Sequence, residues 1–243
     1  QRAVEDARNE ISHENVWIGH YAEVNRPLDA KDYGRTRLIN AVLPYVKVDL
    51  VSYSAYDALW PDRLTEALSY IEEQAQFTDY FNEVFAKKVF VGEYDAYLDY
   101  HVHGYASADV QVEHTRTVIA SALAWGAPFV LFWEFYNNEK ERLHQGGGFW
   151  LIDEEGRKQS VYHLHVALLA KMQLLWLDRE PNSTELSAWA GKLTTVAQPS
   201  ELLLVVLGSA VFRAACEEKS FCEKLGVVAA AASSFESVDV SGI

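Results

Sequence analysis

The most informative part of the chain is the sequence Val-Phe-Val-Gly-Glu-Tyr-Asp-Ala-Tyr at residues 89–97, which is typical of a buried strand that ends in a carboxylate. Strand alternation predicts that Val89 and Val91 share a face with Glu93, and that Gly92 leaves space beside the carboxyl group. An ionised carboxylate in an apolar strand costs free energy unless it lies at the strand end, has a partner or takes part in chemistry. Glu93 is therefore either an acid that leaves the sheet into solvent or the centre of a functional site.

The composition is that of a globular protein with a sizeable core. The chain has 243 residues, of which 49% are hydrophobic, so it has room for one large domain or two small ones. Its formal net charge is -14 and no basic run interrupts the acidic residues, which argues against nucleic acid as a partner. The two cysteines, Cys216 and Cys222, form neither a disulfide framework nor a metal-site spacing. The sequon at residues 182–184 is compatible with secretion, although such sequons often occur by chance.

Helical and strand patterns alternate along the first 177 residues. Strands are expected at residues 16–25, 48–56, 89–97 and 129–135, and helices at residues 1–11, 38–44, 63–88, 112–126 and 161–177, with a polar loop after Arg26-Pro27. Near-continuously apolar strands separated by helices predict parallel β-strands with crossover helices, and therefore an α/β fold. Two architectures fit this pattern: an open doubly wound sheet, and an eight-stranded (β/α) barrel of which the chain supplies about four units.

The sequence predicts no cofactor, metal or membrane partner. The triple glycine at residues 146–148 is followed by an aromatic residue rather than by a lysine or a helix start, so a nucleotide cradle is not expected. His101 and His103 have the spacing of two ligands on a strand, but no third ligand is suggested nearby, and a loop is the preferred interpretation. The apolar runs at residues 202–207 and 227–232 are far too short to span a bilayer.

Two strand motifs and one turn together resemble a known family. Val-Phe-Val-Gly-Glu-Tyr at residues 89–94 precedes Phe-Trp-Glu-Phe-Tyr-Asn-Asn at residues 132–138, and Gly-Phe-Trp-Leu-Ile-Asp-Glu-Glu-Gly-Arg-Lys at residues 148–158 leads into the last helix. In this order and spacing they resemble the seventh strand, the eighth strand and the closing turn of the cellulase-like retaining (β/α)8 glycoside hydrolases. The resemblance spans residues 1–177 and implies the C-terminal half of a (β/α)8 barrel, followed at residues 178–243 by an irregular tail or the start of an appended segment.

The resemblance implies roles for residues at the ends of all four strands. Glu93 matches the catalytic nucleophile, and Trp133 matches the aromatic residue under the reactive sugar. The strand ends implied are Tyr21, Glu23 and Asn25 for the fifth strand, and Tyr53 and Tyr56 for the sixth. Of these, Glu23, Asn25, Tyr53 and Tyr56 are the other substrate-binding residues implied. Structural alternatives remain open for three of them: core packing for Trp133 and Tyr53, and a strand-end acid satisfied by a neighbouring strand for Glu23.

The expected function is hydrolysis of β-linked glycosides with retention, which requires one carboxyl group to attack the anomeric carbon and a second to protonate the leaving oxygen. The family's second carboxyl group lies in an Asn-Glu pair at the end of the fourth strand, and it has no counterpart because the chain begins in the helix that follows. The chain is therefore expected to be an incomplete barrel whose partner is a carbohydrate, and to self-associate through its open sheet edges. The alternatives are a non-catalytic carbohydrate-binding barrel relative and a truncated gene product.

Overall fold

The computed structural model describes residues 2–10, 18–22, 26–56, 61–79, 85–94, 107–133, 150–153, 155–175 and 184. These residues belong to two compact units: Gln1–Tyr94 with Ser121–Phe132, and Asp95–Ala120 with Trp133–Ile243. Several predictions lie outside the described residues, namely those for Glu23, Asn25, His101, His103, the triple glycine and, apart from Thr184, the tail at residues 178–243.

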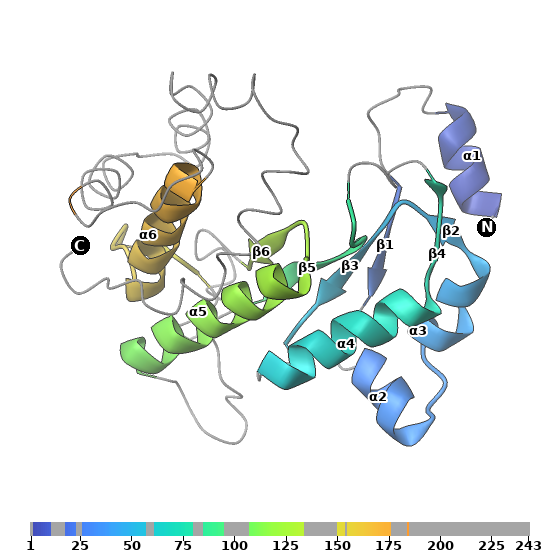
Figure 1. The fold of residues 1–243 in the computed structure, drawn as a ribbon, viewed down its shortest axis with the longest axis horizontal. Coiled ribbons are helices and arrows are strands. Elements are labelled where there is room, and N and C mark those ends of the chain that lie inside the picture. Colours follow the sequence, from blue (N-terminus) through green and yellow to red (C-terminus); the bar gives the residue numbers. More distant parts are fainter. Residues whose placement is uncertain are drawn as a thin grey trace. The chain divides into compact units, whose positions relative to one another are not determined.

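The first unit is built on a parallel four-stranded sheet (Figure 1). Its strands, in spatial order, are β1 (Gly19–Ala22), β3 (Leu50–Ser54), β5 (Val89–Tyr94) and β6 (Val130–Phe132). Each neighbouring pair is parallel, and the spatial order of the strands is their order along the chain. The predicted α/β fold with a parallel sheet is confirmed, and the carboxyl ends of all four strands meet at one edge of the sheet.

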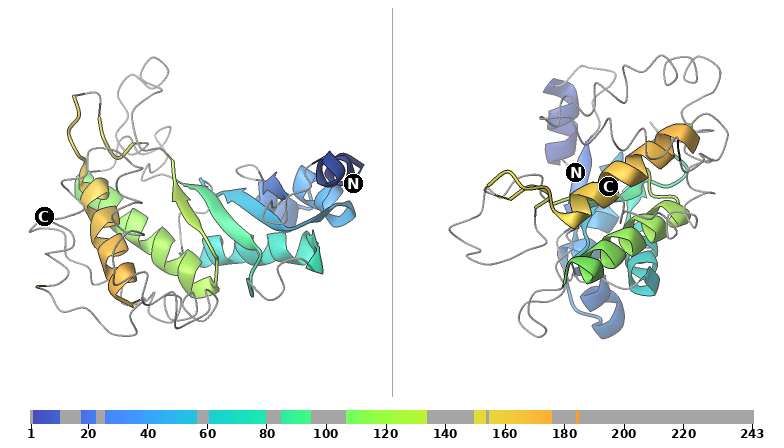
Figure 2. Two further views of the ribbon diagram at one scale, coloured as in Figure 1. Left: turned by 90° about the horizontal axis from the view of Figure 1, so that it is seen from above. Right: turned by 90° about the vertical axis from the view of Figure 1, so that its left-hand side faces the viewer.

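One face of this sheet packs against helices. Helix α4 (Pro61–Gln74) contacts β5, and it also contacts the shorter helices α2 (Arg26–Tyr33) and α3 (Leu38–Ala41). Figures 1 and 2 show α4 lying along the sheet. The side chains that are fully buried here include Val51, Tyr53, Val89 and Val91 of the strands and Leu64, Leu68 and Ile71 of α4. Their removal from water supplies much of the stabilisation of this unit.

Helix α2 corrects one prediction, because a polar loop was expected after Arg26-Pro27 and residues 26–33 are helical. Its signal in the sequence is weak. Pro27 sets the backbone angle of the first turn. The buried apolar face of the helix is small and consists of Pro27, Leu28 and Ala30. Helix α3 follows where a helix was expected, and a 3-10 turn, η1 (Leu43–Tyr45), ends it.

A second correction concerns the long helix expected from residue 63 to residue 88, because α4 ends at Gln74. Residues beyond it form β4 (Gln76–Phe77), which pairs in parallel with β2 (Lys47–Val48). The N–H of Thr78 continues this pairing by donating to the carbonyl of Val48 at 2.9 Å. Sheet pairing therefore satisfies the backbone groups that a longer helix would have satisfied internally.

Asp49, between β2 and β3, is a fully buried carboxylate that fixes the amino end of the sheet. Its N–H donates to the carbonyl of Ile18 at 2.9 Å, and its Oδ2 accepts from the N–H of Ile18 at 2.8 Å. The guanidinium of Arg8, in helix α1 (Arg2–Glu10), donates to Oδ1 at 2.7 Å, and the Thr78 hydroxyl donates to the same oxygen. Burial alone would raise the pKa of Asp49, but these hydrogen bonds outweigh it and hold the pKa below its ordinary value.

Replacing Asp49 by Asn is expected to lower the free energy of unfolding by about 2–3 kcal/mol, because the charge-assisted bonds are lost and buried donors are left unpaired. A carboxylate whose folded pKa lies below its unfolded value of about 3.9 stabilises the fold above that pH, and loses this contribution as the pH falls through the folded pKa. The stability difference between wild type and Asp49→Asn, measured by urea unfolding, should therefore be constant from about pH 7 to 5 and shrink below about pH 4.

The matched control for this prediction is Asp6→Asn, which changes an exposed carboxylate of α1, the helix that carries Arg8. Asp6 is largely exposed in α1 and lies 3.8 Å from the Nε of Arg2. Exposed ion pairs of this kind contribute little, so this variant should keep the stability of the wild type. An Asp49→Asn difference that does not change with pH would contradict the role given to the Asp49 charge.

Helix α5 (Ala108–Trp125) begins in the second unit, and its end from Ser121 belongs to the first. Within the first unit, the Trp125 indole N–H donates to the Ser69 hydroxyl of α4 at 2.9 Å, and the Lys87 ammonium lies 4.5 Å from the centre of the indole ring. These contacts attach the end of α5 to α4 and to Lys87, which lies just before β5.

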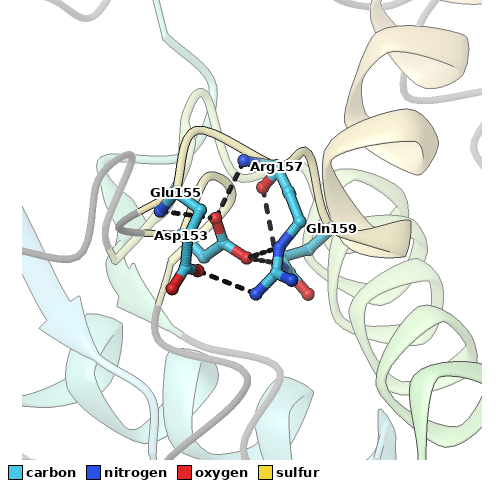
Figure 3. A network of polar contacts seen from close by, with 4 residues as sticks. All are labelled: Asp153, Glu155, Arg157 and Gln159. Atoms are coloured by element: carbon cyan, nitrogen blue, oxygen red, sulfur yellow. Dashed lines mark hydrogen bonds and ion pairs between the residues drawn. The ribbon is translucent and has the colours of Figure 1, made fainter.

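In the second unit, a tight turn leads into helix α6 (Ser160–Leu175), as the sequence predicts (Figure 3). The carboxylate of Asp153 accepts hydrogen bonds from the N–H groups of Glu155 (3.0 Å) and Arg157 (2.8 Å), the Arg157 guanidinium (2.7 Å) and the Gln159 amide (3.2 Å). Gly156 has a φ of 78°, a left-handed conformation that residues with a side chain rarely adopt. The Asp153 carboxylate therefore holds the turn together through hydrogen bonds, and Gly156 provides the left-handed backbone conformation that the turn needs.

Candidate active site

Glu93 lies near the carboxyl end of β5, on the face of the sheet opposite to the buried valines. In the strand register Tyr53 pairs with Val91, whereas the next residue of β3, Ser54, pairs with Glu93. Gly92 is therefore an extra residue on β5, a β-bulge that reverses the alternation of side chains. The expectation that Glu93 shares a face with Val91 is corrected: Val91 is fully buried, and Glu93 is partly exposed.

Three hydroxyl groups donate hydrogen bonds to the Glu93 carboxylate. The Tyr56 hydroxyl donates to Oε1 at 2.6 Å, and the Tyr21 hydroxyl donates to Oε2 at 2.5 Å. The Ser54 hydroxyl also donates to Oε2, at 3.1 Å. The two tyrosine distances are typical of hydroxyl donors to an ionised carboxylate, which only accepts. Residues from β1, from β3 and from the turn after β3 thus orient one carboxylate on β5.

Gly92 lies close to side chains of β3 and β5 that leave no space for a Cβ atom. A Cβ atom at this position would lie 1.7 Å from the Oγ of Ser52 and 3.0 Å from its Cβ. It would also lie 3.2 Å from a ring carbon of Phe90. Glycine is therefore required by close approach. The expectation that Gly92 leaves room beside Glu93 stays a prediction, because these contacts are with Ser52 and Phe90.

The predicted site residues have different positions in the structure. Tyr56 contacts Glu93, whereas Tyr53 is 0% exposed and lies on the face of Val91. Trp133 directly follows β6, belongs to the second unit and is 39% exposed. Glu23 and Asn25 are outside the described residues, as stated above.

Sequence reasoning did not assign two of the three hydroxyl donors, Tyr21 and Ser54, to the site, although it placed Tyr21 at the end of its strand. Ser54 is next to a predicted site residue, but strand parity sets it on the opposite face, and only the bulge brings Glu93 to that face. Tyr21 lies opposite Ser52 on a strand that is not adjacent to β5, so its hydroxyl reaches Glu93 diagonally across β3. The available signal was the position of both residues at strand ends, where parallel strands gather polar groups.

The arrangement gives Glu93 the properties of an oriented base or nucleophile. Its three described partners are neutral hydroxyl groups, which fix the direction of the carboxylate without cancelling its charge. Its partial exposure leaves it accessible to a ligand at the carboxyl edge of the sheet. A carboxylate that served only stability would gain more from burial against a cation, as Asp49 does with Arg8.

The described part of the chain contains no group of three or more His, Cys, Asp or Glu side chains that could hold a metal ion. Within the same residues, no helix is both long and apolar enough to cross a membrane. Comparisons with models of protein families, with curated proteins and with solved structures found no match to the chain.

Substitution of Gly92 by Ala is expected to lower the free energy of unfolding by about 1–3 kcal/mol, because the added methyl group must displace Ser52 and Phe90. Adding Ser52→Gly removes both Ser52 atoms that the methyl group meets, so the double variant should recover most of this loss. Gly19→Ala on β1 is the control, because the nearest atom to its new Cβ is the Leu50 carbonyl oxygen at 3.6 Å. Equal stability of the two single variants in denaturant unfolding would show that the bulge tolerates a side chain.

Proposed function

We propose that the chain is the C-terminal half of a (β/α)8 barrel of the retaining glycoside hydrolase type, and that Glu93 is the nucleophile toward β-linked glycosides. The observation that carries the proposal is the orientation of the Glu93 carboxylate by Tyr21, Ser54 and Tyr56 at the carboxyl edge of a parallel sheet. A nucleophile must be held close to its attack direction, because a small misplacement costs a large factor in rate. The resemblance of residues 89–94 to the seventh strand of that family supports the same assignment.

The strand order supports a barrel segment rather than a doubly wound sheet. A doubly wound sheet reverses its strand order at a switch point and has helices on both faces. The four described strands instead follow one another in chain order. In a barrel, helices cover the outside and the active site lies at the carboxyl ends of the strands. The face of Val51 and Val91 would then be the outer one, and Glu93 would point into the barrel.

The proposed reaction has two steps. An oxygen of Glu93 attacks the anomeric carbon, the bond from that carbon to the leaving oxygen breaks with its electron pair, and a glycosyl ester forms. Water then attacks the same carbon and releases the Glu93 carboxylate, so two inversions give net retention. A second carboxyl group must protonate the leaving oxygen in the first step and take a proton from the attacking water in the second. The candidates are Glu23 in this chain and a residue on the fourth strand of the complete barrel.

A carbohydrate-binding relative without turnover is the second candidate function. An exposed aromatic side chain near a strand end of the first unit, Tyr21 at 51% exposure, favours it. Aromatic rings with an apolar face and a polar edge stack on sugars whether or not a reaction follows. The two candidates differ in whether Glu93 forms a covalent bond to the sugar.

The test is covalent trapping with a panel of 2-deoxy-2-fluoro-β-glycosyl fluorides, which differ in the parent sugar. Fluorine at the second carbon slows both steps, and fluoride leaves without a proton from a general acid, so the ester accumulates even without the second carboxyl group. Intact-mass measurement and peptide mapping are expected to show one added glycosyl group on Glu93 with at least one reagent. The experiment is done with the chain alone and with a separately produced N-terminal half.

The outcome in two variants completes this test. Glu93→Gln should abolish labelling, because an amide does not attack the anomeric carbon, while sugar binding measured by calorimetry persists. Glu113→Gln, at an exposed position of α5, should label like the wild type. Sugar binding without any labelling in either arrangement would favour the carbohydrate-binding candidate, and labelling at another residue would end the assignment of Glu93.

A further inference from the structure

We propose that Tyr21 is a positioning residue that, together with Ser54, holds Oε2 of Glu93 as the non-attacking oxygen and leaves Oε1 to attack the anomeric carbon. The inference rests on the proposed function and adds to it a residue, which the sequence did not predict, and the identity of the attacking atom. The supporting observation is that the two oxygens of the Glu93 carboxylate accept hydrogen bonds from different kinds of donor.

The two donors to Oε2 both come from the sheet. Tyr21 belongs to β1 and donates at 2.5 Å, and Ser54 belongs to β3 and donates at 3.1 Å. Their backbones are fixed by the parallel ladder, in which Tyr21 pairs with Ser52 and Ser54 pairs with Glu93 itself. Ser54 is also only 1% exposed. Groups on strands are placed more firmly than groups on connections.

The described donor to Oε1 has a different origin. Tyr56 lies in a turn, two residues beyond the end of β3, and donates to Oε1 at 2.6 Å. A side chain on a connection yields more readily than one on a paired strand when a substrate arrives. Oε1 is therefore the oxygen whose hydrogen bond can lengthen as the oxygen forms a bond to carbon.

The exposure of Tyr21 also points to a role beyond packing. About half of its side chain is open to solvent, at 51%, so the core does not explain its orientation. Its hydroxyl nevertheless reaches across β3 to a strand that is not its neighbour. The short distance to Oε2 is typical of a strong charge-assisted bond, which is the interaction that would fix the direction of the carboxylate.

The chemistry of the first step fits this division. When Oε1 forms the bond to the anomeric carbon and the leaving group takes the electron pair of the broken bond, the carboxylate becomes an ester. Oε1 is then the ester oxygen and accepts hydrogen bonds weakly, whereas Oε2 becomes the carbonyl oxygen and still accepts them. Tyr21 and Ser54 can therefore stay bonded in the free enzyme, in the transition state and in the ester, so they cost no reorganisation.

The first measurement uses the fluorosugar that labels the wild-type protein, and it separates the trapping rate constant from the half-saturating concentration. Tyr21→Phe keeps the ring and removes the hydroxyl, so the rate constant is expected to fall about tenfold to a hundredfold, as loss of one hydrogen bond to a charged group implies. The half-saturating concentration and the unfolding midpoint should not change. Tyr45→Phe, at an exposed tyrosine in η1, is the matched control and should behave like the wild type.

The second measurement identifies the attacking oxygen from the infrared spectrum of the trapped ester, with carboxyl-labelled glutamate marking the Glu93 carbonyl. A hydrogen bond to a carbonyl oxygen lowers its stretching frequency. The proposal therefore expects the ester band to move to higher frequency in Tyr21→Phe and to stay in place in Tyr56→Phe. The reverse pattern would make Oε2 the attacking oxygen and overturn the assignment.

The remaining outcomes separate the failure of this inference from the failure of the proposed function. A wild-type protein that is never labelled contradicts the proposed function itself. A labelled wild type with an equally fast Tyr21→Phe variant contradicts only the role of Tyr21. A raised half-saturating concentration with an unchanged rate constant would make Tyr21 a sugar-contacting residue instead, and a lowered unfolding midpoint would make it a structural one.

Discussion

The candidate site depends on one extra residue in a strand. Without the bulge at Gly92, strict alternation would carry Glu93 to the face of Val89 and Val91, where the side chains are fully buried. An ionised carboxylate there would lose its hydration without gaining the hydroxyl donors that it now has. Because a bulge inserts one residue on one strand only, it turns the strand end over while the preceding residues keep their apolar packing.

The position of the donors is set at the other end of the same strands. Asp49 binds both the N–H and the carbonyl of Ile18, and this double contact precedes the pairing of Gly19 with Leu50. From that pair the ladder places Tyr21 opposite Ser52. A shift of one residue in this register would turn the Tyr21 side chain to the helix-covered face and remove a donor from Glu93. A buried polar cluster at the amino edge thus determines which groups meet at the carboxyl edge.

The sequence was sufficient to predict the parallel sheet and to single out Glu93 as a candidate site residue, because both inferences depend on local composition. Apolar runs separated by helical patterns indicate parallel strands, and an acid at the end of such a run is conspicuous. The face of Glu93 could not be predicted, because a single glycine in a strand is compatible with either regular pairing or a bulge. The contacts of Tyr21 and Ser54 with Glu93 could not be predicted for the same reason, since they depend on register and on a strand that is distant in sequence.

For helix α2 and strand β4 the secondary structure itself was predicted wrongly, because tertiary contacts override weak local signals in the sequence. Helix α2 has a small apolar face made by Pro27, Leu28 and Ala30. The other residues of the helix are mostly polar, so the sequence shows little helical periodicity. Strand β4 continues a helical pattern in the sequence, yet its backbone pairs with β2. Short elements have few internal hydrogen bonds, so a modest gain from packing or pairing decides their structure.

Asp49 and Glu93 are two carboxylates that one sheet holds in different ways. Asp49 is 0% exposed and bonded to the Arg8 guanidinium, so its charge is compensated and it contributes to stability. Glu93 is partly exposed and held by the hydroxyl groups of Tyr21, Ser54 and Tyr56, which carry no charge. A cation in their place would orient the carboxylate equally well but would stabilise its negative charge and oppose its transfer to an electrophilic carbon. Neutral donors, two of them on fixed strands, give direction with less loss of reactivity, which is the combination that the proposed nucleophile requires.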